Sequence, residues 1–151
     1  MTTKIFAPLS GRAIPLGEVS DPVFAKKMLG DGMAIIPANS IVASPIMGKV
    51  TMLAETKHAI GLVTEEGIEV LIHIGIDTVT LKGVGFKSLV SIDDSVQIGT
   101  PLVEFDPSVL KEHTLDPTTM IIVTNSKDFT IDAPTSNSQV TQNVDPLFSV
   151  S

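Results

Sequence analysis

The stretch that decides the fold is T-K-H-A-I-G-L at residues 56–62, the turn T-E-E-G at 64–67, and E-V-L-I-H-I-G-I-D-T-V at 69–79. Both runs can be divided into alternating positions, the pattern of a β-strand with one buried face. The turn between them joins the runs into a predicted antiparallel hairpin. Two of the chain's three histidines, His58 and His73, lie on its two arms.

The register of the hairpin decides how the two histidines meet. If Glu65 and Glu66 form a two-residue loop, His58 lies directly opposite His73, with Cβ atoms about 4.5–5.5 Å apart. A bulge at Gly67 shifts the register by one residue, and the sequence is compatible with both arrangements. In the unshifted register, the face of the histidines also carries Thr56, Ile60, Leu71, Gly75 and Asp77.

The composition predicts a globular protein rich in β-structure. With 151 residues the chain can bury one core, and we expect residues 1–151 to form a single domain. Hydrophobic residues make up 43% of it and Trp and Tyr are absent, so the core should be aliphatic. Short Val- and Ile-rich runs, separated by 11 Gly and 10 Pro, predict an all-β fold. We expect an antiparallel β-sandwich or barrel-sandwich with short helical turns.

Charge and cysteine content exclude several classes of function. The absence of cysteine excludes disulfides, thiolate zinc sites and a cysteine nucleophile. A net charge of −7 argues against a nucleic-acid partner, which needs a basic face, and suits a basic protein partner. No run reaches the roughly 18 apolar residues of a membrane helix, and the N-terminus lacks the apolar core of a signal peptide. We therefore expect a cytoplasmic location without membrane insertion.

Turn and cap residues predict the remaining elements. Asp21, followed by a proline, marks the start of a short helical turn, and a second helix is expected within 107–117. Residues 127–142 are predicted to be a surface loop with one strand at most. The similar phrases Q-I-G-T-P-L at 97–102 and Q-N-V-D-P-L at 142–147 predict an internal repeat. Strands are expected at 4–7, 13–16, 32–37, 40–44, 48–54, 57–64, 68–76, 85–89, 102–106, 120–124 and 147–150.

Three kinds of chemistry compete at this stage, and the first is phosphoryl transfer. A neutral imidazole such as that of His73 attacks well near pH 7, and the phosphoramidate it forms is labile enough to leave again. The Gly75 carbonyl would then hold the proton of the second ring nitrogen. His58, oriented by Thr56, would donate a hydrogen bond to the phosphoryl oxygens. This chemistry needs no metal or other cofactor.

Zinc hydrolysis and cofactor carriage have less support in the sequence. A zinc hydrolase site built on His73 and Asp77 needs a third ligand, commonly from an H-x-H pair, which the chain lacks. The remaining histidine, His113, lies in a polar stretch that is predicted to be exposed. A biotin or lipoyl carrier would use S-P-I-M-G-K at 44–49, but Lys49 begins a predicted strand instead of lying at a hairpin tip. Proline and glycine in that segment are typical of a tight turn.

Six strings taken together resemble a known family. They are I-F-A-P-L-S-G at 5–11, D-P-V-F at 21–24, G-D-G-M-A-I at 30–35, T-K-H-A-I-G at 56–61, H-I-G-I-D-T-V at 73–79 and V-E-F-D at 103–106. In this order they resemble the glucose-type enzyme IIA (EIIA) of the bacterial phosphoenolpyruvate-dependent sugar phosphotransferase system, over residues 5–150. T-K-H-A-I-G-L equally resembles the IIA segments of multidomain β-glucoside, sucrose and trehalose transporters.

The resemblance implies an antiparallel β-sandwich that carries a phosphoryl group. It implies that His73 accepts this group from the phosphorylated carrier protein HPr and passes it to a cysteine of a IIB domain. His58 would be the neighbouring active-site histidine, Thr56 its hydrogen-bond partner, and the Gly75 carbonyl the group that orients His73. The alternative function is a regulatory module that controls permeases or kinases through the same face.

The resemblance also implies a docking surface for the partners. Asp21 and Asp77 match acidic positions that meet an arginine of HPr, and apolar residues surround them. Thr80 and Val84 stand where some relatives carry glutamate, so we expect fewer acidic groups in the surrounding ring. The apolar rim positions are Val23, Phe24, Ile60 and Leu71.

Overall fold

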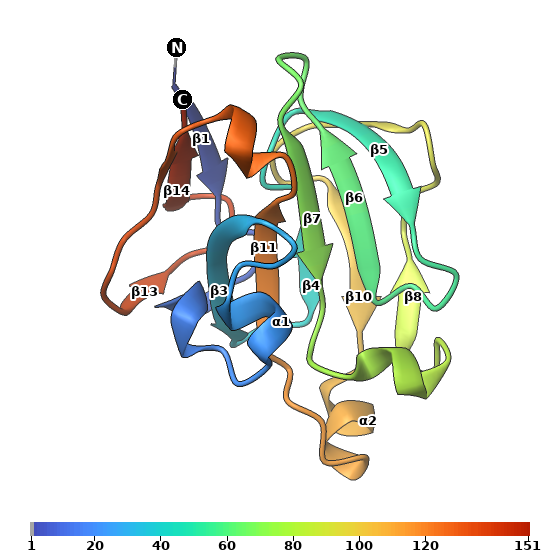
Figure 1. Cartoon of the computed structure of the whole chain (residues 1–151). Helices are drawn as coiled ribbons and strands as arrows, with labels where there is room; N and C mark the ends of the chain where they lie inside the picture. Colours follow the sequence, from blue (N-terminus) through green and yellow to red (C-terminus); the bar gives the residue numbers. More distant parts are fainter. Residues whose placement is uncertain (1) are drawn as a thin grey trace.

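Antiparallel strands form the framework of the chain. A computed structural model describes residues 2–151, and its largest sheet has eight strands, antiparallel at every pairing (Figure 1). Their order across the sheet is β13 (Ser138–Val140), β2 (Gly11–Pro15), β3 (Asp31–Pro37), β11 (Thr119–Val123), β7 (Glu69–His73), β6 (Ala59–Val63), β5 (Gly48–Leu53) and β9 (Ser95–Val96).

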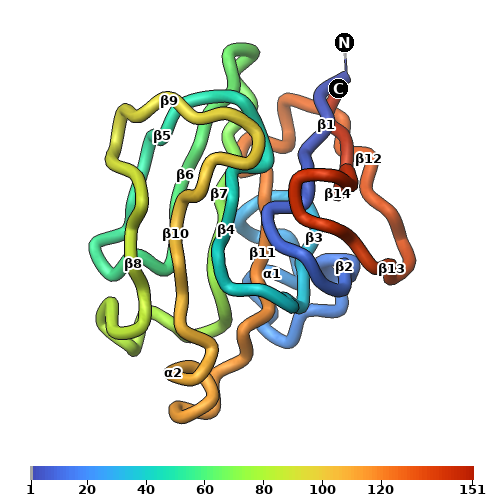
Figure 2. The backbone as a smooth tube through the Cα atoms, turned by 180° about the vertical axis from the view of Figure 1, so that it is seen from behind, coloured from blue at the N-terminus to red at the C-terminus, as the bar shows by residue number. Residues whose placement is uncertain are grey.

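Two smaller antiparallel sheets lie behind the large one (Figure 2). The described chain begins and ends in the first of them, where Thr3 pairs with Val150. This layered arrangement confirms the predicted all-β fold. The first sheet contains β1 (Thr3–Phe6), β14 (Pro146–Val150) and β12 (Ile131–Asp132), and the second contains β4 (Ile41–Ala43), β10 (Pro101–Phe105) and β8 (Phe86–Ser88).

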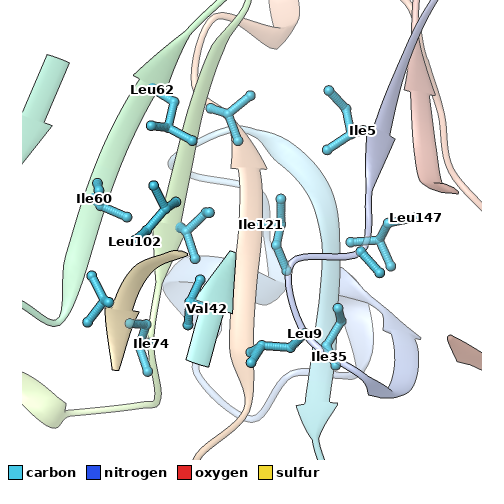
Figure 3. Close-up of a cluster of buried hydrophobic side chains, with 14 of the residues drawn as sticks. Ile5, Leu9, Ile35, Val42, Ile60, Leu62, Ile74, Leu102, Ile121 and Leu147 are labelled. Carbon is cyan, nitrogen blue, oxygen red and sulfur yellow. The ribbon is translucent and has the colours of Figure 1, made fainter. Parts of the chain in front are cut away.

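Branched aliphatic side chains fill the space between the layers. Ile60 and Ile121 of the large sheet are 0% exposed and share one buried cluster with Val42 and Leu102 of the second small sheet (Figure 3). Burying a side chain of this size stabilises the fold by about 1.5–3 kcal/mol. Because side chains alternate along a strand, the residues between these positions face the outer side of the large sheet. The candidate site lies on that outer side.

Only short helices occur in residues 2–151, and none is long and apolar enough to cross a membrane. Asp21 accepts a hydrogen bond from the backbone N–H of Val23 at 2.9 Å, so it caps α1 as predicted. Asp106 caps α2 in the same way, through the N–H of Ser108 at 3.0 Å. The helical segments are η1 (Leu16–Glu18), α1 (Pro22–Ala25), η2 (Thr78–Leu81), α2 (Pro107–Glu112) and η3 (Ser126–Asp128).

The chain repeats one arrangement twice. In the large sheet, β2-β3-β11 on one side of the centre matches β5-β6-β7 on the other, and each half has its own three-stranded sheet. The strings A-P-L-S-G at 7–11 and S-P-I-M-G at 44–48 form equivalent turns. In each turn, the proline carbonyl accepts a backbone hydrogen bond from the strand that precedes the other turn, at 2.9 and 3.0 Å. We therefore describe the large sheet as two equivalent halves.

The repeat predicted from residues 97–102 and 142–147 fits this arrangement. Each phrase forms the loop before the middle strand of a small sheet. Each also donates a backbone hydrogen bond to the first residue of the equivalent turn. The donor and acceptor pairs are Gly99 to Ser44 at 2.9 Å and Asn143 to Ala7 at 3.0 Å.

Candidate active site

The β6–β7 hairpin has a bulge in its turn. The Thr64 backbone N–H donates to the carbonyl four residues further on at 3.0 Å, and Gly67 adopts φ +90°. This is the shift by one residue that a bulge at Gly67 produces. Ala59, instead of His58, therefore lies opposite His73. Of the two registers with which the sequence is compatible, the structure therefore has the bulged one.

The shifted register changes which side chains reach the outer face. Ile60, labelled in Figure 3, pairs with Ile72, and both residues are 0% exposed and belong to the main core. Ile60 was predicted to lie on the docking rim, but it offers no surface to a partner. The reason is that a slip of one residue moves a strand's side chain to the opposite face. On the outer face, His73 lies between Ala59 of β6 and Met120 of β11.

The two histidine rings are nevertheless neighbours. His58 precedes β6, in a bend where Lys57 adopts φ +62°, so it lies outside the regular pleat of the strand. Its carbonyl accepts a hydrogen bond from the Ile74 N–H at 2.7 Å, which ties the bend to the end of β7. The ring centroids of His58 and His73 are 4.9 Å apart, with an interplanar angle of 81°. The rings therefore meet edge to face.

A hydrogen bond at Nδ1 determines the tautomer of His73. This nitrogen lies 2.9 Å from the carbonyl oxygen of Gly75. Because a carbonyl can only accept a hydrogen bond, Nδ1 carries the proton. In the neutral ring, Nε2 then keeps a free lone pair. Gly75 turns its carbonyl back toward the ring with φ +74°, a backbone conformation that favours glycine.

Thr56 holds the second ring. Its Oγ1 lies 2.6 Å from Nδ1 of His58, whose side chain is only 8% exposed. Both histidines are therefore held through Nδ1, which makes Nε2 the free nitrogen of each ring. Thr56, His58, His73 and Gly75, which were selected from the sequence, come together in one site.

Phe24 packs against the other side of His73. It lies on α1, which covers β3 and β11 in Figure 1. The ring centroids of Phe24 and His73 are 4.9 Å apart, with an interplanar angle of 54°. Phe24 is only 5% exposed and belongs to a small outer cluster with Met120 and Ile122. It was predicted to form part of the docking rim, but its burial leaves a partner little of it to contact.

Burial lowers the pKa of His73, and the nearby ring of His58 lowers it further. The hydrogen bond to Gly75 and the carboxylates of Asp21 and Asp77 act in the opposite direction, but burial outweighs them. Burial also lowers the pKa of His58. Both rings are therefore neutral near pH 7, the form in which an imidazole nitrogen is a nucleophile.

Comparison with known proteins identifies the family. Residues 3–129 match the family model described as phosphoenolpyruvate-dependent sugar phosphotransferase system, EIIA 1. The chain belongs to this EIIA family. The family resemblance that six sequence strings indicated is thereby confirmed, and this family is part of the phosphoenolpyruvate-dependent sugar phosphotransferase system.

Two known proteins are similar to this EIIA chain. The "PTS system glucoside-specific EIICBA component" of Staphylococcus carnosus is 50% identical over 122 residues, which are 81% of this chain and 18% of that relative. The structure of glucose permease IIA from Mycoplasma capricolum is 39% identical, with a TM-score of 0.87. The match covers 99% of this chain and 96% of that one. The chain thus spans less than a fifth of the first relative and nearly all of the second.

Four of the predicted partner-binding residues reach the EIIA surface around His73. Val23, on α1, is 39% exposed, and Asp77, directly before η2, is exposed. Asp21 and Leu71 are partly exposed, Leu71 on the outer face two residues before His73. The two carboxylates are close enough to influence the pKa of His73. Acidic and apolar residues with exposed surface therefore lie on the elements next to the ring.

An apolar hollow of about 290 Å³ lies on the outer face of the half of the large sheet that β5, β6 and β7 form. Gly61 contributes no side chain there, and Met52 and Leu71 line the space. Gly61 pairs with Leu71, in the row next to the pair of Ala59 and His73. The hollow therefore adjoins the candidate site.

Zinc hydrolysis and cofactor carriage do not fit the EIIA site. In residues 2–151, no group of three or more His, Cys, Asp or Glu side chains is placed to hold a metal ion. His113 instead caps α2, with Nδ1 at 2.9 Å from the Val109 carbonyl. Lys49 lies on β5 and pairs with Asp93 at 3.7 Å, so it is not at a hairpin tip. Membership of the EIIA family overturns both the interpretation as a zinc hydrolase and the interpretation as a biotin or lipoyl carrier.

One residue close to the site, Thr78, was not predicted to belong to it, although the family string at 73–79 includes it. Thr78 is 0% exposed, and its Oγ1 donates a hydrogen bond to the carbonyl of Ile74. It lies on η2, beyond the tight turn that ends β7. The period-two pattern does not extend past that turn, so it could not indicate that Thr78 is buried.

Proposed function

We propose that this EIIA chain is a phosphocarrier in which His73 Nε2 carries the phosphoryl group. The observation that supports this best is the hydrogen bond from His73 Nδ1 to the Gly75 carbonyl, at 2.9 Å. It leaves Nε2 with a free lone pair. Phe24 and His58 pack against the ring and restrict its rotation.

In the accepting step, the donor is the phosphohistidine of HPr. The lone pair of His73 Nε2 attacks phosphorus in line, and the P–N bond to HPr breaks with its electron pair returning to the HPr ring. The Nδ1 proton stays on its hydrogen bond to Gly75. The positive charge that develops on the His73 ring is stabilised by this carbonyl and by the carboxylates of Asp21 and Asp77.

In the donating step, the acceptor is a cysteine thiolate of a IIB domain. The sulfur attacks phosphorus, the Nε2–P bond breaks, and the electron pair returns to Nε2 of His73. This chain has no cysteine, so the thiolate belongs to another domain or another chain.

His58 acts in the donating step, where it stabilises the phosphoryl group as this group leaves His73 for the IIB cysteine. When the Thr56 hydroxyl donates to Nδ1 of His58, the proton of the neutral ring lies on Nε2. That proton can be donated to a phosphoryl oxygen on the neighbouring His73. His58 itself carries no phosphoryl group in this scheme.

HPr and the IIB domain dock in turn on the outer face around His73. Asp21 and Asp77 receive a basic group of the partner, and Val23 and Leu71 form an apolar rim that excludes water. When the apolar rim excludes water, the charge interactions between the partner and the two carboxylates become stronger.

We also propose that residues 1–151 are one EIIA domain that acts in the cytoplasm beside a sugar transporter. The glucoside-specific EIICBA relative supports a link to a larger transporter, because the matched region is 18% of its length.

The test is incubation of the chain with phosphoenolpyruvate, enzyme I and HPr, followed by phosphorus NMR. Wild type and the control His113→Gln should give a phosphohistidine signal, and His73→Gln should give none. Phosphohistidine that persists in His73→Gln would overturn the assignment. His58→Gln should still accept phosphate from HPr but should transfer it poorly to a IIB cysteine. An equal loss of both half-reactions would contradict the role given to His58.

A further inference from the structure

The turn that follows β7 holds the carbonyl on which the tautomer of His73 depends. It runs from Ile74 to Asp77 and leads directly into η2. Gly75 has φ +74° and Asp77 has φ +61°, so two of the four residues adopt the left-handed conformation. Such a turn persists only where its surroundings hold it.

Backbone hydrogen bonds anchor the turn on two sides. The Ile74 N–H donates to the carbonyl of His58 at 2.7 Å, and the Ile76 N–H donates to the carbonyl of Asp116 at 2.9 Å. The bond from Ile76 anchors the Gly75–Ile76 peptide, whose carbonyl accepts the hydrogen bond from His73 Nδ1–H, but neither bond holds the Ile74–Gly75 peptide that precedes it.

Thr78 holds this peptide from the η2 side. Its hydroxyl donates to the carbonyl of Ile74, and its side chain is 0% exposed. Its methyl group also packs over Gly75, since a Cβ added to Gly75 would lie 2.5 Å from Thr78 Cγ2. A buried hydroxyl with such a partner is costly to remove, because the carbonyl then loses a donor in a place that water does not reach.

We propose that Thr78 is a positioning residue for His73, whose hydroxyl fixes the Ile74–Gly75 peptide so that the Gly75 carbonyl keeps the proton on Nδ1 and leaves Nε2 free. This inference rests on the proposed function of His73 as phosphoryl acceptor. Thr78 acts through the turn, by its hydrogen bond to the carbonyl of Ile74.

Two substitutions separate the hydroxyl from the rest of the side chain. Thr78→Val keeps the shape but removes the donor, and Thr78→Ser keeps the donor but removes the methyl group. In Thr78→Val, the rate of phosphoryl transfer from HPr should fall about tenfold, the factor that corresponds to one hydrogen bond of ordinary net strength. The KM for phospho-HPr should not change, because the docking surface is intact.

The tautomer of His73 gives a measurement that a general loss of stability would not move. Long-range proton–nitrogen NMR of the ring should show the proton on Nδ1 in wild type and Thr78→Ser. In Thr78→Val, a fraction of the proton should move to Nε2. The matched control is Thr64→Val, which removes another buried threonine hydroxyl at the far end of the same hairpin, where it accepts from the Ile68 N–H at 3.0 Å.

A Thr78→Val protein with the tautomer and transfer rate of wild type would overturn the proposal. Equal losses in Thr78→Val and Thr78→Ser would also overturn it, because serine retains the hydroxyl. If Thr78→Val does not fold, the same two measurements on the smaller Thr78→Ala decide the question. A wild-type protein that is not phosphorylated on His73 would instead refute the proposed function, so the two failures are distinguishable.

Discussion

The two equivalent halves of the large sheet differ on their outer faces. On β2-β3-β11, the connection at residues 16–30 folds over the strands (Figure 1). Phe24 of this connection joins Met120 and Ile122 in a second small core. On β5-β6-β7, the equivalent connection is only residues 54–58, and the outer face stays open, with Met52 39% exposed.

His73 lies where the covered half meets the open half. On the outer face it has Met120 on one side and Ala59 on the other. Phe24 reaches it from the covered half and His58 from the open half, each with a ring centroid distance of 4.9 Å. A repeated framework thus becomes a site through the unequal length of one connection. The covered half supplies burial, and the open half supplies access for partners.

The largest effect should come from placing a charged side chain on the inner face of the open half instead of on its outer face. Ile60→Asp places a charge in the core, at a cost of several kcal/mol, enough to unfold most of the chain. Met52→Asp, on the outer face of the neighbouring strand, should change the free energy of unfolding by no more than about 1 kcal/mol. Urea unfolding followed by circular dichroism measures both. Similar losses in the two variants would refute the register found for β6.

A smaller loss should follow from removing the aromatic ring at the border of the covered half. Phe24→Ala should lower the free energy of unfolding by about 3 kcal/mol, because a buried phenyl ring is lost. It should also raise the pKa of His73, since water reaches a ring whose pKa is lowered mainly by burial. NMR titration of His73 measures this pKa. Met52→Ala, on the open half, is the control, and in that variant the pKa of His73 should not change. An unchanged pKa in Phe24→Ala would show that other groups bury His73.

The positions of long strands could be predicted from the sequence because one face of each is apolar. The strand expected at 32–37 is β3, Asp31–Pro37, and the one expected at 147–150 is β14, Pro146–Val150. Strands of two or three residues carry little pattern, and among them only β4 and β8 were expected at defined positions, 40–44 and 85–89. For this reason β9 was missed, and residues 127–142 contain two strands instead of one at most.

The site could be predicted only as far as local sequence determines it. The bonds of His73 to Gly75 and of Thr56 to His58 join residues two positions apart, and the family strings include all four. The exposure of a side chain depends instead on register and on distant segments. Ile60 was therefore misplaced, because alternation does not distinguish a two-residue loop from a bulged one.

The histidines at the border should make stability depend on pH. The pKa values of His58 and His73 in the folded protein lie below the value of about 6.5 for an unfolded histidine. At a pH between the folded and unfolded pKa values, the unfolded state therefore binds more protons than the folded state. The free energy of unfolding should therefore be highest above about pH 6.5 and should fall as the pH drops from there toward the folded-state pKa values. Below those values, this contribution should change no further.

Urea unfolding between pH 7.5 and 5 tests this dependence. The double variant His58→Gln with His73→Gln should lose part of the slope. His113→Gln, which changes an exposed histidine on α2, should keep it. Equal slopes in wild type and the double variant would mean that the border histidines do not contribute.

The smallest effect concerns the short connection of the open half. Lys57 adopts φ +62°, a conformation that costs an ordinary side chain about 1 kcal/mol or more, and it lies between Thr56 and His58. Lys57→Gly removes this strain but adds freedom to the unfolded chain, so the net gain in unfolding free energy should be below about 1 kcal/mol. Lys57→Val should lose about 1–2 kcal/mol of unfolding free energy, because a β-branched side chain tolerates this conformation poorly.

Phosphoryl transfer to His73 should be unchanged in Lys57→Gly, since the bond between Thr56 and His58 does not involve the lysine side chain. If glycine destabilised the chain as much as valine does, the backbone of this connection would not be under strain at Lys57.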